Sequence, residues 1–441
     1  MFYNKEIETL PLDKLRKLQN ERLKSVIERV YHNVPFYKKQ FDKAGITPSD
    51  IKGVQDLHKI PFTKKTDLRD NYPFDLFAVP QNEVVRIHAS SGTTGKPTVV
   101  GYNQHDLKVF DEVVARSLVT AGARKGMKLH NAYGYGLFTG GLGMHGGATE
   151  LGMAVIPVSG GMTDRQLMII QDFQPEVICC TPSYAQTLGE EIKKRGISLD
   201  DINLKYAILG AEPWTETIRS QVEKSLNVNA TNIYGLSEII GPGVSQEDYE
   251  EKGTGSYIWE DHFYPEIVDR DTGEPLSYGE EGVLVFTTLT KQALPILRYW
   301  TNDICSIYYD KGAKRTHIKM SAIKGRSDDM LIIRGVNLFH TQVEVLLEDF
   351  EHLAANYQLI VTREGLMDDV KLDVEVSEDL AKNINPANFR QHELIQQLTA
   401  QLNQKIKNNI GLSMKVELKP YNTIPRSAGG KLSRIKDLRK L

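Results

Sequence analysis

Short apolar runs alternate with helical patterns over residues 129–234, and this alternation restricts the fold more than any other feature of the sequence. Two of the runs, 177–180 and 206–209, are continuously apolar, which is typical of strands buried on both faces. The runs lie at 129–133, 153–158, 177–180, 206–209 and 230–234, and another helical pattern, at 106–121, precedes them. The alternation predicts an α/β fold with a mostly parallel sheet covered by helices on both sides.

The flanking segments have different patterns. Residues 11–45 repeat apolar side chains at helical spacing. After about residue 255 the strands become longer and alternate in polarity, as in 282–288, which predicts an antiparallel, barrel-like subdomain. Beyond Gly325 we expect a small α+β unit with helices at 341–350 and 388–408 and its last strand at 414–418. A chain of 441 residues exceeds one typical domain. We therefore expect an N-terminal domain over 1–325 and a C-terminal domain over 326–441.

Charge and cysteine content exclude several classes of protein. The net charge of −3, with both signs interspersed, gives no reason to expect nucleic acid or an anionic membrane as a partner. The basic tail at 431–441 is the local exception, and we interpret it as a solvated terminus. No run approaches the roughly 18 apolar residues of a membrane span. The few cysteines, Cys179, Cys180 and Cys305, make a disulfide framework improbable, so we expect a cytoplasmic protein.

Hydroxyl groups and glycines gather in one eight-residue turn between apolar strands at 84–88 and 98–102. The turn reads Ser90, Ser91, Gly92, Thr93, Thr94, Gly95, Lys96, Pro97. Hydroxyls, uncovered backbone N–H groups and an ammonium are the groups that bind phosphate oxygens. The common nucleoside-triphosphatase loop needs glycine at Ser90 and a hydroxyl at Pro97, so this turn is a different motif. The residues alone leave two hypotheses, a phosphate-binding loop and an ordinary surface turn.

Two further segments follow predicted strands and would emerge at the carboxyl edge of the sheet, where open α/β folds bind ligands. They are Tyr234-Gly235-Leu236-Ser237-Glu238 and Gly210-Ala211-Glu212-Pro213. An aromatic ring there can stack on a purine, and a carboxylate can hold Mg²⁺. For each glutamate, the alternative is a carboxylate at the start of a helix.

A rival motif runs from Gly141 to Gly146 and matches the dinucleotide fingerprint letter for letter. The next strand ends at Ser159 rather than at the acidic residue that would hold a ribose. We favour a glycine-rich helix start that lets a flat ligand approach the backbone. Tyr135 and Phe138 would be the apolar walls of this acyl pocket, with Gly140 and Gly141 beside them.

In chain order, the phosphate-type turn and the two edge segments resemble motifs of the adenylate-forming enzymes, the superfamily of acyl-CoA synthetases, luciferases and adenylation domains. Three later segments do so too: Leu297–Asp303, Gly325–Asn337 and Pro425–Lys431. The longest match, Gly325–Asn337, looks closest to the phenylacetate-CoA ligase family. The resemblance covers the chain from about residue 85 to its end. It implies ATP, Mg²⁺ and coenzyme A as ligands, and a reaction through an acyl-AMP.

The resemblance also implies roles for single residues of the N-terminal domain. The turn from Ser90 to Lys96 would bind the phosphates. Gly210 to Pro213, together with Tyr234 and Gly235, would form the adenine pocket. Asp303 would bond the ribose hydroxyls, and Glu238 would hold Mg²⁺.

The remaining implied roles belong to the C-terminal domain. Arg326 would contact the ribose, and Asp328 would be the interdomain hinge. Arg334 and Gly335 would face the thiol donor after the domain rotates. Lys431 would neutralise charge during acyl-AMP formation and then withdraw. From the residues alone, Arg326 and Asp328 would be a surface ion pair and Lys431 a solvated lysine.

Two departures from the family pattern stand out. Trp300 and Asn302 occupy positions where the relatives show Arg or Gly types, and the residues suggest no replacement role. Relatives also have a Cys-x-Cys pair where this chain has residues 311–314. Without those thiolates, Cys305, His262 and His317 make a poor tetrahedral set, so we expect no structural zinc.

These observations predict an ATP-dependent aryl-carboxylate CoA ligase of the phenylacetate-CoA ligase type. The acyl group should be aromatic, because Tyr135 and Phe138 offer rings and no acidic residue lies nearby to meet an amino group. Partners are then a carboxylic acid, ATP and CoA, with a homodimer left open. Alternatives are another acid, another acceptor such as a carrier protein or a deazaflavin, and, from a different class, a nicotinamide oxidoreductase using Gly141–Gly146.

Overall fold

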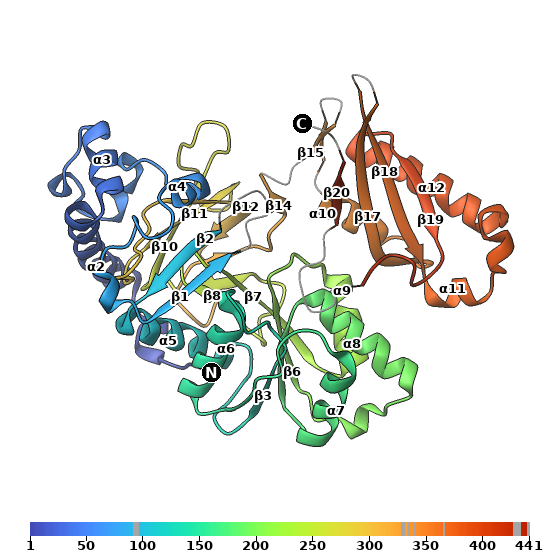
Figure 1. Cartoon of the computed structure of the whole chain (residues 1–441). Helices are drawn as coiled ribbons and strands as arrows, with labels where there is room; N and C mark the ends of the chain where they lie inside the picture. The colour runs from blue at the N-terminus through green and yellow to red at the C-terminus, as the bar shows by residue number, and fades with distance from the viewer. Residues whose placement is uncertain are drawn as a thin grey trace.

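One sheet runs through the larger of two lobes, and half of it is parallel (Figure 1). The computed structural model describes residues 1–90, 97–327, 331–333, 336–338, 340–364, 367–426 and 434–438. The parallel strands neighbour one another in the order β7-β6-β5-β3-β4. Their bounds are β3 (Lys128–Asn131), β4 (Ala154–Ile156), β5 (Val177–Cys180), β6 (Tyr206–Gly210) and β7 (Asn229–Leu236). The predicted α/β fold with a parallel sheet is confirmed.

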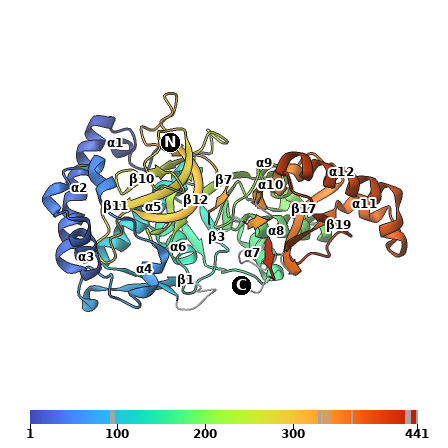
Figure 2. The same cartoon turned by 90° about the horizontal axis from the view of Figure 1, so that it is seen from above.

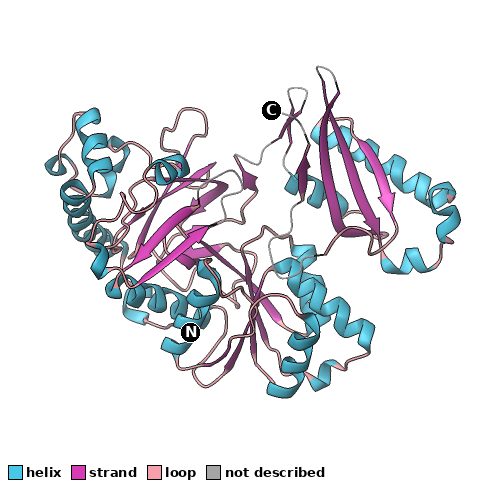
Figure 3. Cartoon of the chain, in the orientation of Figure 1, coloured by secondary structure: helices cyan, strands magenta, loops and turns pink. Residues whose placement is uncertain are grey.

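Helices cover both faces of this parallel sheet (Figure 3). In β5, Val177 and Cys179 share a core with α5 and α6, whereas Ile178 and Cys180 pack with α7, α8 and α9. Successive side chains of a strand point to opposite faces, so a strand covered on both sides must be apolar throughout. The covering helices are α5 (Gln104–Thr120), α6 (Thr139–Leu151), α7 (Thr163–Phe173), α8 (Pro182–Arg195) and α9 (Glu216–Leu226).

The other half of the sheet is antiparallel and continues from β7, in the order β7-β8-β9-β13-β12-β11-β10, with β14 also paired to β12. This agrees with the polarity alternation seen after residue 255. The strands are β8 (Gly241–Glu247), β9 (Ser256–Ile258), β10 (Phe263–Val268), β11 (Glu281–Thr288), β12 (Tyr299–Tyr308), β13 (Lys319–Met320) and β14 (Gly325–Arg326).

A separate hairpin carries the hydroxyl-rich turn. Its strands, β1 (Arg86–Ser90) and β2 (Thr98–Tyr102), pair antiparallel with Ser90 opposite Thr98. The residues between them, 91–96, lie outside the described part of the chain.

The N-terminal segment is helical, as predicted, and packs on the main core. Its helices are α1 (Lys5–Glu8), α2 (Leu12–Asn33), α3 (Pro35–Ala44) and α4 (Lys65–Asp70). Short 3₁₀ turns in the two lobes are η1 (Pro48–Asp50), η2 (Val54–Lys59), η3 (Gln81–Glu83), η4 (Leu199–Asp201) and η5 (Pro386–Gln391). Among the described residues, none of the helices combines the length and the apolar character needed to cross a membrane.

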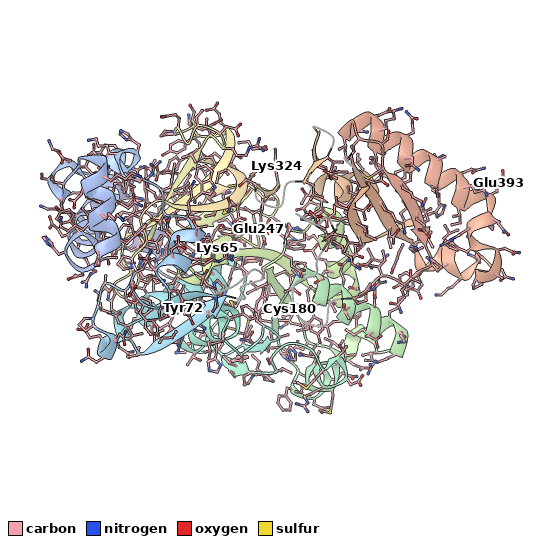
Figure 4. The ribbon with its side chains drawn as sticks, turned by 45° about the horizontal axis from the view of Figure 1, so that its top comes forward. Lys65, Tyr72, Cys180, Glu247, Lys324 and Glu393 are labelled. Carbon is pink, nitrogen blue, oxygen red and sulfur yellow. The ribbon has the colours of Figure 1, made fainter. Side chains whose placement is uncertain are left out.

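The smaller lobe has its own sheet and its own core (Figure 2). Its main sheet has the order β19-β18-β17-β20, and β15 pairs with β16. The core contains buried side chains from Leu331 onward, whereas Ile323 still packs on the core of the larger lobe. In Figure 4, Lys324 lies where the chain leaves the larger lobe. The elements are β15 (Leu331–Ile333), β16 (Val336–Leu338), α10 (His340–Leu347), β17 (Leu353–Glu364), β18 (Met367–Val376), α11 (Glu378–Lys382), α12 (Glu393–Ile410), β19 (Lys415–Lys419) and β20 (Ile435–Asp437).

The sequence did not reveal β20. This strand lies parallel to β17, with Ile435 opposite Leu359. The described part of the basic tail, 434–438, thus contains an edge strand, and the side chains at 436–438 are exposed, as expected of a solvated terminus. Three residues with a single apolar side chain show no period, so the pattern could not have predicted this strand.

The rival glycine motif lies inside α6 and serves helix packing. A Cβ atom on Gly143 would come within 2.3 Å of the Phe110 ring of α5, and one on Gly147 within 2.4 Å of Val114. At Gly146 the obstacle is Asp111, also on α5. Contact with α5 therefore accounts for Gly143 and Gly146. The ligand approach expected at the start of the helix, beside Gly140 and Gly141, stays a prediction.

This packing predicts a difference between two glycines of the same helix. Gly147→Ala should destabilise the protein by about 1–3 kcal/mol, because the new methyl group overpacks the α5 contact. Gly140→Ala is the control, since its Cβ would meet nothing closer than 3.6 Å. Midpoints of thermal unfolding measure both variants. Equal shifts would contradict the role assigned to Gly147.

Candidate active site

Tyr234, Asp303 and Arg326 form one hydrogen-bonded group at the carboxyl end of β7. The Tyr234 hydroxyl donates to Asp303 Oδ2 at 2.6 Å, and Arg326 Nη1 donates to Asp303 Oδ1 at 2.9 Å. Asp303 and Arg326 face each other across β12 and β14. Burial, aided by the Asp303 carboxylate, raises the pKa of Tyr234 well above its ordinary value, so the hydroxyl remains a donor. Three predicted nucleotide-binding residues from three strands are thus in contact.

Glu238 lies in the turn between β7 and β8, two antiparallel strands. The alternative of a helix-start carboxylate is therefore wrong for Glu238. Its carboxylate is buried and accepts a hydrogen bond from the Tyr299 hydroxyl at 3.1 Å. The Lys291 ammonium donates to the Glu238 carbonyl oxygen at 3.4 Å. Burial lowers the pKa of Lys291 to about 8, so this cation is still mostly charged at neutral pH and balances Glu238.

The hairpin, the loop before α6 and the Glu238 turn adjoin one another. The Tyr102 hydroxyl of β2 donates to the carbonyl oxygen of Ile240 at 2.8 Å. The Ala89 N–H of β1 donates to the carbonyl oxygen of Leu137 at 2.9 Å. The hydroxyl oxygens of Thr139 and Ser237 are 3.0 Å apart. The two strands that carry the hydroxyl-rich turn therefore end beside the other predicted site segments.

The turn from Gly210 to Pro213 emerges next to Tyr234, since Gly210 pairs with Ile233 of β7. A Cβ on Gly210 would lie 2.2 Å from the Ile233 carbonyl oxygen, so this strand contact requires glycine. Ala211 has a φ of 71°, a strained conformation for alanine that occurs most often at functional sites. The Glu212 carboxylate accepts hydrogen bonds from Ser183 N at 3.2 Å and Ser183 Oγ at 3.0 Å. Glu212 is therefore a carboxylate at the start of a helix, as the alternative hypothesis expected, but the helix is α8 rather than α9.

Of the predicted acyl-pocket residues, Tyr135 has its side chain held by a hydrogen bond, whereas the side chain of Phe138 is exposed. The Tyr135 hydroxyl accepts a hydrogen bond from Asn131 Nδ2 at 2.8 Å, and burial raises its pKa to about 12. The Phe138 side chain is 53% exposed. A Cβ on Gly141 would lie 2.4 Å from the carbonyl oxygen of Gly134, so this glycine closes the loop onto α6. These roles remain predictions.

Several predicted residues lie outside the described part of the chain, so the structure does not test them. This set comprises Ser91, Gly92, Thr93, Thr94, Gly95, Lys96, Asp328, Arg334, Gly335 and Lys431. Ser90 is described only as the last residue of β1.

The first departure from the family pattern, at Trp300 and Asn302, has a structural explanation. The Trp300 ring packs edge-on against Phe62 with 4.9 Å between centroids, and its indole N–H donates to Asn302 Oδ1 at 2.8 Å. Asn302 has a φ of 68°, which asparagine tolerates better than most residues. Its backbone carbonyl accepts from Ser327 N at 2.7 Å, and its side-chain oxygen from Ser327 Oγ at 2.9 Å. Asn302 therefore anchors the residue that precedes the predicted hinge.

Three supporting residues were not predicted from the sequence: Tyr299, Lys291 and Ser183. A signal existed for Tyr299, because residues i and i+4 of a strand share a face, and Tyr299 stands four positions before Asp303. Lys291 and Ser183 gave no signal. Each reaches its partner only through the tertiary fold.

Among the described residues, no group of three His, Cys, Asp or Glu side chains is arranged to hold a metal ion. His262 Nε2 lies 2.8 Å from Glu112, and His317 Nδ1 accepts the Glu260 N–H at 2.9 Å, so both rings have protein partners. The absence of structural zinc remains a prediction. Mg²⁺ needs only one or two carboxylates beside substrate phosphates, and the single carboxylate of Glu238 fits that requirement.

Comparison with known proteins places both lobes in families of AMP-binding enzymes. Residues 5–290 match the model of the AMP-binding enzyme family, and residues 335–439 match that of the AMP-binding enzyme C-terminal domain. The chain is 61% identical to a phenylacetate-coenzyme A ligase of Thermus thermophilus, with full coverage of both chains. It is 50% identical to the Escherichia coli protein of the same name over 99% of this chain and 97% of the relative.

Solved structures of 2-hydroxyisobutyryl-CoA ligase, 26% identical in sequence, resemble the chain to different degrees. In the postadenylation state with R3-HIB-AMP the TM-score is 0.90, covering 99% of this chain and 92% of that one. In the thioesterification state with 2-HIB-AMP and CoA it is 0.72, covering 100% and 93%. In an open conformation it is 0.74, covering 99% and 94%. The sequence identity is 26% in each case, so the difference in TM-score reflects the arrangement of the lobes.

Proposed function

Because this chain belongs to the phenylacetate-coenzyme A ligase family of AMP-binding enzymes, we propose that it joins an aryl carboxylic acid, most favourably phenylacetate, to coenzyme A at the expense of ATP. The observation that carries the proposal is the contact of Tyr234, Asp303 and Arg326 at the carboxyl edge of the sheet. A carboxylate with two donors already in place is a suitable acceptor for ribose hydroxyls.

The reaction needs two steps, because a carboxylate anion resists attack by a nucleophile. In the first step a carboxylate oxygen attacks the α-phosphorus of ATP, and pyrophosphate leaves. In the second step the CoA sulfur attacks the acyl carbon, AMP leaves with the bridging oxygen, and the thiol loses its proton. No covalent bond to the enzyme is required, so the protein acts mainly by positioning and by charge stabilisation.

The nucleotide would lie across the two lobes. Tyr234 would stack on the adenine, with its ring oriented by the hydrogen bond to Asp303. The turn from Gly210 to Pro213 would line the adenine pocket, and Arg326 would contact the ribose. Arg326 stands just before the predicted hinge at Asp328. The binding of a nucleotide at Arg326 would therefore depend on the position of the smaller lobe.

The phosphates would be bound by the turn from Ser90 to Lys96, by Lys431 and by Mg²⁺ on Glu238. Magnesium would neutralise negative charge on the phosphate oxygens. The hydrogen bond from the Tyr299 hydroxyl holds this carboxylate in place, and Lys291 binds the backbone carbonyl oxygen of Glu238. Magnesium and a cytoplasmic location rest on the sequence alone, and a homodimer is left open.

A panel of acids tests the proposed function. With ATP, Mg²⁺ and CoA, phenylacetate should release AMP faster than a fatty acid or a free amino acid does, because Tyr135 and Phe138 offer aromatic walls without a carboxylate for an amino group. Quantitation of AMP and of the thioester measures this preference. A preference for either of the other acids would overturn the acyl assignment, and undiminished product without CoA would point to another acceptor.

A further inference from the structure

Two described arginines flank the segment that carries Lys431, Arg426 before it and Arg434 after it. Arg434 contacts the smaller lobe, whereas Arg426 contacts both lobes. On the far side, Arg434 pairs with Glu344 of α10 at 3.5 Å and lies over the ring of Tyr357. Its carbonyl oxygen accepts the N–H of Leu359 in β17 at 2.8 Å. All three partners belong to the smaller lobe, so this end moves with that lobe.

On the near side, Arg426 is held first by its own lobe. Arg426 Nη1 lies 2.8 Å from Oε2 of Glu375, whose side chain is fully buried. The same carboxylate accepts the backbone N–H groups of Asn422, at 3.0 Å, and Ile424. Glu375 thus fixes both the guanidinium of Arg426 and the chain that leads to it.

The same guanidinium also reaches the larger lobe. Arg426 Nε donates to Glu190 Oε2 of α8 at 3.4 Å. The Arg426 side chain is only 16% exposed, and the ring of Tyr421 lies 5.3 Å beneath it. Figure 2 shows α8 beside the smaller lobe. Burial raises the pKa of Tyr421 to about 12, with the Glu190 carboxylate adding to the shift, which agrees with this proximity.

The bridge joins the two lobes in the present arrangement. The present arrangement matches the postadenylation state of 2-hydroxyisobutyryl-CoA ligase at a TM-score of 0.90, against 0.72 for its thioesterification state. Rotation of the smaller lobe would carry Arg426 and Glu375 away together and leave Glu190 behind on α8. A contact made in only one of two states shifts the equilibrium toward that state.

We propose that Arg426 is a positioning residue that docks the smaller lobe against Glu190 of α8 for acyl-AMP formation only. Arg426 would keep its ion pair with Glu375 in both arrangements of the lobes. It would pair with Glu190 only in the arrangement for acyl-AMP formation. The proposal rests on the proposed function, because it assumes two half-reactions with different lobe positions.

Reversal of the charge on Glu190 tests it. Glu190→Arg should slow pyrophosphate release from ATP and phenylacetate without CoA by about fivefold to tenfold. Thioester formation from supplied phenylacetyl-AMP and CoA should stay unchanged or become faster, because the competing arrangement is weakened. Glu190→Gln should give a smaller effect in the same direction. High salt screens the charges, so it should reduce the difference in the rate of pyrophosphate release between Glu190→Arg and the unmodified enzyme.

The neighbouring residue supplies a matched control. Glu191 pairs with Lys194 and Arg195 of its own helix, so Glu191→Arg should leave the ratio of the two half-reactions unchanged. Substitution of Arg426 itself is less informative, since it would leave Glu375 buried without a cation.

Two outcomes would overturn the role of Glu190: equal loss in both half-reactions, or the same split in Glu191→Arg. Failure of the proposed function looks different, because then the unmodified enzyme forms no acyl-AMP from any acid of the panel.

Discussion

Replacement of Lys431 by alanine should slow acyl-AMP formation by about a hundred- to thousandfold and spare thioester formation from supplied acyl-AMP. A preorganised cation that neutralises charge developing between a carboxylate and the α-phosphate contributes about this much to rate. In the second half-reaction charge develops instead on the acyl oxygen and on the departing AMP, and Lys431 is expected to have withdrawn by then. The selective loss therefore follows from the presence of Lys431 in one step only.

Single-turnover assays measure the two half-reactions separately. Pyrophosphate release without CoA reports the first, and thioester formation from phenylacetyl-AMP reports the second. Lys436→Ala is the control, since Lys436 is an exposed lysine of β20 five positions further along the chain. Equal loss in both half-reactions for Lys431→Ala would argue against a lysine that serves one lobe arrangement.

The pattern of the sequence predicted the parallel sheet because burial on both faces leaves a direct trace in composition. Every residue of Val177–Cys180 is apolar, and every one is buried. The same logic located Tyr234 and Gly210, since residues that follow buried parallel strands must emerge at one edge. These inferences needed only local pattern and one rule of topology.

Other features could not be predicted because their causes are contacts between distant segments. The glycines of α6 match a nucleotide fingerprint in letters, yet the feature that selects Gly143 and Gly147 is the surface of α5. Asn302 looked like an unexplained departure until its bonds to Ser327 were visible. The bridge from Arg426 to Glu190 spans 236 positions of sequence and exists only once the two lobes are placed.

The two arginines around Lys431 suggest how one lysine can serve a single step. Both are attached within the smaller lobe, through Glu375 and Glu344, so the segment between them is carried as the lobe moves. Selectivity between the two steps then depends on which surface of the larger lobe the smaller lobe meets. In the present arrangement Arg426 meets α8.

Asp303 should behave differently from Lys431, because AMP is bound in both half-reactions. Asp303→Ala removes the carboxylate that would accept the ribose hydroxyls. A hydrogen bond to a charged group contributes about 1.5–3 kcal/mol, so kcat/KM for ATP should fall about tenfold to hundredfold or more. Thioester formation from limiting phenylacetyl-AMP should fall by a similar factor. Asp303→Asn keeps the shape, and should lose most of the same activity if the charge is what matters.

The matched variant is Tyr234→Phe, which keeps the ring that would stack on adenine and removes only the hydroxyl that donates to Asp303 at 2.6 Å. Its effect should stay within about tenfold, since Arg326 still holds the carboxylate at 2.9 Å. Thermal unfolding of each variant separates loss of binding from loss of fold. An unchanged KM for ATP in folded Asp303→Ala would show that the ribose does not bind at Asp303. The contact among Tyr234, Asp303 and Arg326 at the junction of the lobes would then need an explanation other than nucleotide binding.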